Sequence, residues 1–292
     1  MNDTPDLSLI ISVYNREEVL RLVLAAVQRQ SFRRFEVIVA DDGSGPAVKD
    51  VVDESRAEYG LSITHLWQED AGWRKNRILN SAVRASCSSY LVFIDGDCLP
   101  GKDFLLDHYT EREDGKVLLG RRVEMSKRWA GKLTLAKVMS GRFERIGIPE
   151  LLDGALGKAL RIEDGIRITS PSIRELIGRK SATILGSNFS LPKKDLVAIN
   201  GFDETYDGPG HGEDSDIQYR LSLIGVTGKS LRNLAVQYHV YHPRTEPSER
   251  SLRRFEEVKR SGDPTCSDKA SSLVGTTGTP QITFKIYSPR IS

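Results

Sequence analysis

The sequence has few cysteines, and they form no metal or disulfide pattern. Cys87, Cys98 and Cys266 are widely spaced among 292 residues and form no CxxC pair. The chain therefore lacks both the ligand spacing of a structural zinc site and the cysteine density of a disulfide-stabilised secreted domain. A reducing compartment fits this usage, and we expect a cytoplasmic location.

Other absences narrow the class of protein further. No stretch approaches the roughly 20 apolar residues that a membrane span needs. The N-terminus carries Asp3 and Asp6 and no basic region before an apolar segment, which argues against a secretory signal. A formal net charge of +2 gives no electrostatic reason to expect a nucleic-acid partner. The chain is nevertheless long enough to bury a sizeable core.

Strand and helix patterns alternate through the first hundred residues. Buried strands are predicted at residues 7–13, 36–40, 61–66 and 90–94. Helical spacing of apolar residues between them predicts helices at residues 17–30, 48–59 and 74–85. This alternation predicts an α/β fold with a mostly parallel central sheet and helices on both faces. Ligands of such sheets bind at the carboxyl ends of the strands.

The second half is less regular. Residues 127–177 mix apolar and basic side chains. They suit either a flap or surface near a membrane or an ordinary helical excursion. The first alternative would mean peripheral association of the protein with the inner face of the membrane. Further patterns predict strands at 182–191 and 234–238 and helices at 193–199 and 213–224. Beyond about residue 261, the Ser, Thr, Gly and Pro content is typical of a loosely ordered tail.

Two acidic motifs follow predicted strands. Asp95 and Asp97 flank a glycine, and two such carboxylates are costly to hold together unless a cation neutralises them. Oxygen ligands favour Mg²⁺ or Mn²⁺, and such an ion can neutralise a leaving diphosphate. Asp42 could accept hydrogen bonds from a base or ribose, with Gly43 allowing a close backbone approach. Ordinary acidic turns remain the alternative at both places.

Four motifs in order resemble glycosyltransferase family 2, whose fold is called GT-A. They are ISVYNR, VIVADDGS, FIDGDCLP and GHGEDSDIQYRL. The last resembles the GGEDxD signature of galactosyltransferase-type and chondroitin-polymerase-type enzymes. The resemblance covers roughly residues 7–242, and the ordered set is far more specific than any one motif.

The resemblance implies a fold, a reaction and partners. It implies a GT-A nucleotide-diphospho-sugar transferase domain at residues 1–245, with a nucleotide-binding half (1–125) and an acceptor-binding half (126–245). Residues 246–292 would form a C-terminal basic helix and a poorly ordered tail. The reaction would be inverting transfer of a hexose or N-acetylhexosamine from a nucleotide-diphosphate sugar, with UDP as the expected carrier. The acceptor would be a hydroxyl of a glycan or lipid-linked glycan in surface polysaccharide or lipopolysaccharide synthesis.

Family roles map onto matching positions. The resemblance implies nucleotide contacts from Tyr14, Arg16, Asp42 and Asp95, and Mn²⁺ or Mg²⁺ ligation by Asp95 and Asp97. Among the basic residues Arg74, Lys75 and Arg77, the helix pattern favours Arg77 for the diphosphate, although a solvated basic face is the alternative.

The GED segment and a late histidine complete the candidate set. Inversion needs a base that takes the acceptor proton, and the resemblance points to Asp214, with Glu213 and Asp216 contacting acceptor hydroxyls or holding the loop. The alternative is a helix start that complements the dipole. Pro209, Gly210 and His211 depart from the family pattern, which leaves the acceptor pocket open. Related enzymes carry a metal-binding histidine here, matched better by His239 than by His242. Residues 186–188 are expected either as a wall of the sugar site or as a bulge.

Two other functions compete with transfer. A sugar-1-phosphate nucleotidyltransferase would carry a glycine-rich basic loop where Tyr14, Asn15 and Arg16 stand. A relative that binds glycan or nucleotide without turnover is the second alternative, and the intact carboxylates argue against it.

Overall fold

The computed structural model describes residues 4–177, 183–208, 213–243, 246, 248–265, 273 and 285–287. The main sheet has the strand order β11-β3-β2-β1-β4-β8-β6-β9. Its strands are β1 (Leu7–Val13), β2 (Phe35–Asp41), β3 (Ile63–Trp67), β4 (Tyr90–Asp95), β6 (Lys116–Leu119), β8 (Phe189–Pro192), β9 (Thr227–Ser230) and β11 (Lys285–Tyr287). Strands β3, β2, β1 and β4 are parallel, whereas β8 runs antiparallel to β4 and β6.

A second, smaller sheet adjoins the first. It has the order β5-β10-β7, formed by β5 (Cys98–Pro100), β10 (Gln237–His239) and β7 (Val123–Glu124). Strand β10 is antiparallel to β5 and parallel to β7. This sheet joins the turn after β4 to a segment about 140 residues later in the chain.

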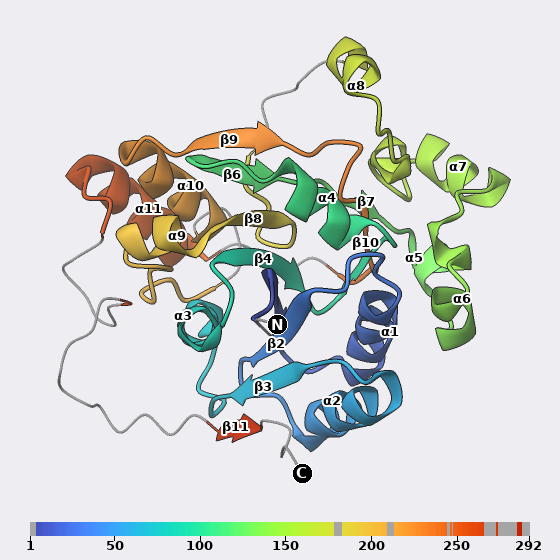
Figure 1. Ribbon diagram of the computed structural model, residues 1–292, viewed down its shortest axis with the longest axis horizontal. Helices are drawn as coiled ribbons and strands as arrows, with labels where there is room; N and C mark the ends of the chain where they lie inside the picture. The colour runs from blue at the N-terminus through green and yellow to red at the C-terminus, as the bar shows by residue number, and fades with distance from the viewer. Residues whose placement is uncertain are drawn as a thin grey trace.

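Helices cover both faces of the main sheet (Figure 1). The α-helices are α1 (Glu17–Gln28), α2 (Pro46–Tyr59), α3 (Lys75–Ala85), α4 (Phe104–Glu111), α5 (Lys127–Ala130), α6 (Leu135–Met139), α7 (Ile148–Ala155), α8 (Pro171–Ile177), α9 (Lys193–Ala198), α10 (Glu213–Leu223) and α11 (Glu249–Ser261). Two 3₁₀ turns, η1 (Arg142–Glu144) and η2 (Ile162–Gly165), lie among them. None of the helices in the described part of the chain is long and apolar enough to cross a membrane.

The alternation of side chains along β1 explains the two layers. Ile11 packs with α1, α2 and α4 in one core cluster, whereas Ile10 packs with α3, α9 and α10 in the other. Successive strand residues point to opposite faces, so a strand covered on both sides must be apolar throughout. The predicted α/β class, with a mostly parallel sheet and helices on both faces, is confirmed.

The later strand predictions were partly wrong. Of the described residues from 183 to 191, only those of β8 form a strand, and residues 186–188 form a turn rather than a bulge. The Asn188 amide donates to the carbonyls of Arg121 and Ala235, which holds that turn in place. The strand expected at 234–238 begins only at Gln237, because the preceding apolar residues bend with Ala235 at a positive φ of 43°.

The C-terminal region contains the expected helix, and most of the residues after that helix are not described by the structure. The predicted C-terminal helix corresponds to α11. The predicted loosely ordered tail lies outside the described residues apart from 261–265, 273 and 285–287. At 127–177 the chain forms α5 to α8, which stand beside the sheet layers (Figure 1).

A buried ion pair anchors helix α10. Arg220 donates to the Asp216 carboxylate from its Nε atom at 2.8 Å and is completely buried. Its remaining nitrogens donate to the carbonyls of Ile199 and Gly201 at 2.6 and 2.8 Å. Asp216 therefore holds the first turn of α10 against the preceding loop.

Removal of the Asp216 carboxylate is expected to destabilise the protein strongly. Asp216→Ala leaves a buried guanidinium without its counter-ion, a change that costs about 3–5 kcal/mol. The free energy of unfolding, measured by urea denaturation, checks this. Glu249→Ala, which breaks an exposed pair with Arg253, serves as the control and should leave the midpoint unchanged. Equal midpoints for the two variants would contradict the anchoring role.

Candidate active site at the ends of the parallel strands

A cavity of about 300 Å³ opens at the carboxyl ends of β1, β2 and β4. Its walls bring together Tyr14, Arg16, Asp42, Asp95 and Asp97, which lie up to 83 positions apart in the sequence. Parallel strands end on the same edge of a sheet, so the polar groups after each strand converge there. These five side chains, all candidates from the sequence, thus lie around one cavity.

The loop after β1 is fixed in an uncommon conformation. Asn15 and Arg16 have positive φ values of 54° and 60°, which few non-glycine residues adopt. The Asn15 backbone N–H donates to Ser44 Oγ at 2.7 Å, which ties this loop to the one after β2. The resulting turn directs Arg16 Nη1 to Asp97 Oδ2 at 2.9 Å. Tyr14 remains half exposed, with its hydroxyl donating to Asp70 Oδ2 at 3.0 Å.

The two carboxylates after β2 have different tasks. Asp41 is fully buried, where it pairs with His65 Nε2 at 2.9 Å and accepts from the Ser44 backbone N–H at 2.8 Å. Asp42 lines the cavity and accepts from the Arg74 backbone N–H at 2.8 Å. Burial raises the pKa of Asp42 above its usual value despite that hydrogen bond. The carboxylate nearer the ligand space is therefore Asp42, as the sequence suggested.

Asp95 and Asp97 face different partners. Asp95 accepts from Ser12 Oγ at 2.8 Å and from Lys75 Nζ at 2.7 Å. Burial is the largest influence and works to raise the pKa of Asp95, but the charges of Lys75 and Arg122 and the hydrogen bond from Lys75 together bring it below its usual value. Gly96 between the two fits tightly, since a Cβ there would lie 3.0 Å from the Ser12 carbonyl oxygen.

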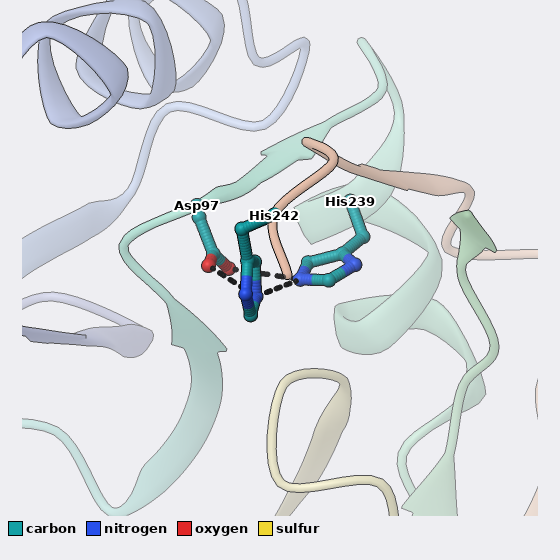
Figure 2. A group of neighbouring side chains, drawn as sticks. All are labelled: Asp97, His239 and His242. Carbon is teal, nitrogen blue, oxygen red and sulfur yellow. Dashed lines mark hydrogen bonds and ion pairs between the residues drawn. The ribbon is translucent and has the colours of Figure 1, made fainter. Parts of the chain in front are cut away.

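Asp97 lies opposite two imidazoles, as Figure 2 shows. The Nε2 atoms of His239 and His242 are 3.5 and 3.3 Å from the two carboxylate oxygens and 3.1 Å from each other. The Nδ1 atom of His239 is 2.6 Å from Glu124 Oε2, and that of His242 is 2.8 Å from the Pro243 carbonyl oxygen. Both rings are thus oriented to present Nε2 to Asp97.

This trio fits a divalent cation. One carboxylate and two oriented imidazoles, with ligand atoms within 4.8 Å of one another, form a usual mixed donor set. Burial alone would lower the pKa of His239, but the hydrogen bonds to Asp97 and Glu124 raise it to about 9. The imidazole therefore lies in the anionic surroundings that attract a cation. The sequence left His239 and His242 as alternatives, and the structure brings both to the cluster.

A second grouping places Asp95 and Asp97 beside Cys98. Burial raises the pKa of the Cys98 thiol well above its usual value, which keeps it protonated and makes it a poor ligand. Asp95 instead has Lys75 as its close cation. The two carboxylates thus have different close partners, although their oxygens lie within 4.8 Å of each other, and ligation by both stays a prediction.

Asp214 lies in the first turn of α10, and its side chain is not among those that line the cavity. Its Oδ1 accepts from the Ser215 backbone N–H at 2.8 Å, and its Oδ2 accepts from Gly186 at 3.3 Å. Burial raises the pKa of Asp214, with these hydrogen bonds and Lys75 acting in the opposite direction. Glu213 is the first residue of α10, but its side chain lies outside the described residues. The same holds for residues 209–212, where the sequence departs from the family pattern.

The cation that faces the cavity from α3 is Lys75, not Arg77. Arg77, the choice favoured from sequence, is not among the side chains that line the cavity, and its contact with the diphosphate stays a prediction. Residues two apart on a helix point about 200° apart, so the two side chains cannot serve the same face. Lys75 shares its face with Ile78, three residues later, which also lines the cavity.

Sequence reasoning also missed Arg122 and Glu124. Arg122 donates from Nε to Glu124 Oε1 at 2.9 Å and from Nη1 to Ser187 Oγ at 3.0 Å. These contacts join β7 to the turn at 186–188. The only signal in the sequence is the spacing of two between the charged residues, which places both on one side of a short strand.

Comparisons with known proteins identify the family. The model of "Glycosyl transferase family 2" matches residues 8–160, and that of "N-terminal domain of galactosyltransferase" matches residues 177–243. The first match covers more than half of the chain, which therefore belongs to glycosyl transferase family 2. The resemblance stated from the motifs is therefore confirmed.

Curated relatives are longer than this chain. A chondroitin synthase of Escherichia coli is 30% identical over 258 residues, which are 82% of this chain and 35% of the relative. A validoxylamine A glucosyltransferase of Streptomyces hygroscopicus subsp. limoneus is 30% identical over 233 residues, 76% of this chain and 49% of the relative. The chain thus spans about a third of one relative and half of the other.

Solved structures share the fold. A complex of GalNAc-T7 with UDP, GalNAc and Mn²⁺ has a TM-score of 0.63 at 13% identity, over 89% of this chain and 48% of that one. The mannosyltransferase PcManGT from Pyrobaculum calidifontis, in complex with GDP-Man and Mn²⁺, has a TM-score of 0.53 at 16% identity, over 92% and 66%. At this identity the likeness concerns the fold alone, and it agrees with the expected GT-A class.

Glu124→Gln is expected to weaken Mn²⁺ binding about 10–100-fold, because carboxylates that orient a ligating imidazole commonly contribute that much. Titration calorimetry of the purified protein with Mn²⁺ measures the effect. Glu111→Gln, which alters a carboxylate paired with Arg174 and Lys229, is the matched control and should leave the affinity unchanged. Unaltered Mn²⁺ affinity of Glu124→Gln would show that His239 needs no such support.

Proposed function

We propose that this chain transfers a hexose or N-acetylhexosamine from a UDP-linked sugar to a hydroxyl of an acceptor glycan, with inversion at the anomeric carbon. The observation that supports it best is that Asp42 and Asp97 line one strand-end cavity, where Asp97 also belongs to the cluster with His239 and His242. Lys75, which lines the same cavity, lowers the pKa of Asp214. We assign residues 1–125 to the nucleotide, 126–245 to the acceptor and 246–292 to a C-terminal extension.

The donor would lie across the ends of β1, β2 and β4. Asp42 offers carboxylate oxygens for a base N–H or ribose hydroxyls, and half-exposed Tyr14 offers a ring beside them. Arg16 and Lys75 pair with Asp97 and Asp95, and they supply positive charge where a diphosphate needs it. Asp95 would orient Lys75 for that contact.

Asp97, His239 and His242 would hold the divalent cation, with Glu124 fixing the His239 ring. The mixed oxygen and nitrogen set favours Mn²⁺ over Mg²⁺, which prefers oxygen ligands and retained waters. When bound, the cation supplies positive charge that neutralises the departing diphosphate. Asp95, whose carboxylate lies within 4.8 Å of that of Asp97, would be a further ligand from the nucleotide side.

Asp214 would act as the general base. It would take the proton of the acceptor hydroxyl while that oxygen bonds to the anomeric carbon and the bond to the diphosphate oxygen breaks. A single displacement of this kind inverts the configuration. The raised pKa of Asp214 makes the carboxylate a stronger base than an ordinary aspartate. Asp216 is committed to Arg220, so the neighbouring acidic residue left for acceptor hydroxyls is Glu213.

The setting we propose is assembly of a surface polysaccharide or lipopolysaccharide. A glycan or lipid-linked glycan would be the acceptor, and the protein would be cytoplasmic and associate peripherally with the inner face of the membrane. Support comes from relatives named chondroitin synthase and hyaluronan synthase. Nucleic acid is not an expected partner.

A donor screen tests the proposed reaction. Purified protein with a panel of UDP-sugars and GDP-sugars should turn over one donor, and only when Mn²⁺ is present. Asp214→Asn should lower transfer about 10²–10⁴-fold while nucleotide binding persists, because only the proton acceptor is lost. Asp114→Asn, which alters an exposed pair with Lys194, is the control. Full transfer by Asp214→Asn would refute the base, and Mn²⁺-dependent nucleotide binding without any turnover would indicate a binding protein.

The pH profile of kcat/KM should show where the base titrates. Asp214 works only when deprotonated, so activity falls as the pH drops through its pKa, which burial places above the ordinary value of 3.8. Lys75 lowers that pKa, so Lys75→Gln should move the acid limb to higher pH. Lys194→Gln, on the exposed surface, should leave the limb in place. A limb that stays fixed or moves down in Lys75→Gln would rule out Asp214 as the titrating group.

A further inference from the structure

Helix α7 has its apolar side turned outward. Ile148, Leu152 and Leu156 are 75%, 57% and 66% exposed, and Leu151 is also exposed. Within α7, the buried side chain is that of Asp153. The four apolar residues recur at the spacing i, i+3, i+4 and i+8, so they form one continuous stripe on the helix. We name this stripe the α7 face.

The contacts of the opposite side fix this orientation. The Asp153 carboxylate accepts from Ser126 Oγ and from Arg128 Nε, the latter at 3.1 Å. Gly154 packs on Ile162, where a Cβ would lie 2.5 Å from the Ile162 Cδ1 atom. A polar bond and a glycine contact therefore attach α7 to the body. The helix cannot roll its leucines inward without breaking a partly buried ion pair.

The apolar surface continues beside the helix. A groove of about 720 Å³ has Leu151, Leu160 and Ile166 in its walls, with Arg161 among them. Leu160 and Ile166 are themselves exposed. In Figure 1, α7 stands with α5 and α6 on the side of the molecule opposite α3 and α10. The α7 face and the groove thus form one apolar region, and Leu160 in its wall pairs with Glu124 of β7.

The charge of this segment is unlike that of the rest of the chain. Residues 127–177 contain 10 Lys and Arg against 6 Asp and Glu, a net charge of +4, whereas the whole chain carries +2. The remaining residues therefore carry −2. Lys158 and Arg161 are exposed next to Leu156 and Leu160, and Arg145 is exposed shortly before Ile148. Exposed apolar side chains bordered by cations are typical of helices that lie in the interface of anionic membranes.

We propose that the α7 face docks on the surface of an anionic phospholipid bilayer, with its leucines in the acyl boundary and the neighbouring lysine and arginine side chains at the headgroups. A second copy on the same surface would bring two segments of +4 together, so charge favours the lipid. The inference locates the peripheral association suggested above and rests on that part of the proposed function.

Vesicle co-sedimentation tests it with the full chain. The protein should bind vesicles of mixed phosphatidylglycerol and phosphatidylcholine and bind phosphatidylcholine alone much more weakly, with added salt reducing the binding. Leu152→Glu/Leu156→Glu should lower the partition coefficient at least about tenfold, because each apolar side chain withdrawn from the acyl boundary removes a contribution of that order. Leu252→Glu, which makes the same change at an exposed leucine of α11, should bind like the wild type.

Each outcome decides between alternatives. Vesicle binding that is equal in the double variant and the wild type would overturn the proposal. The proposal would also be overturned if the wild type bound no vesicles and formed a dimer in ultracentrifugation that became monomeric in the double variant. Mn²⁺-dependent turnover of the donor without an acceptor should be the same in the double variant as in the wild type. Loss of vesicle binding with intact donor turnover therefore separates this inference from the proposed reaction, which the donor screen tests by itself.

Discussion

The site depends on the charge of one carboxylate, Asp97. Its oxygens lie within 3.5 Å of Arg16, His239 and His242, which come from the loop after β1 and from the segment around β10. The Asp97 backbone carbonyl also accepts from the Val240 N–H at 2.9 Å. A carboxylate so deeply placed needs opposite charge or hydrogen-bond donors around it. That need joins three segments that are distant in the sequence.

The register of the small sheet places His239 beside Asp97. His239 of β10 pairs with Cys98 of β5 on one side and with Glu124 of β7 on the other. The residue after Asp97 is thereby set beside the histidine, and the carboxylate that orients the ring is its neighbour across the ladder. A shift of one residue would turn His239 to the opposite face and remove it from Asp97. The geometry of the cation site is therefore a consequence of strand pairing.

Local patterns were sufficient for the first hundred residues because each strand there is covered on both faces. Ile10 and Ile11 pack against helices on opposite faces of the sheet. A continuous apolar run of this kind is therefore typical of a strand that is buried on both faces. Later elements depend on distant partners. The short β8 is defined by antiparallel pairing with β4 and β6, and Glu124 gains its position by pairing with β10 and with Leu160. No local pattern in the sequence contains that information.

The choice between Lys75 and Arg77 shows the same limit within one helix. Both are basic, and the motif alone could not say which faced the strand ends. The phase of α3 is set by Ile78, which must lie on the cavity side, and three-residue spacing then brings Lys75 with it. Lys75 is 2.7 Å from Asp95 and also lowers the pKa of Asp214. One ammonium group thus acts on the carboxylate of the donor side and on the proposed base. In the proposed reaction, a diphosphate beside Lys75 would offset part of its field at Asp214, and the base would be strongest when the donor is in place.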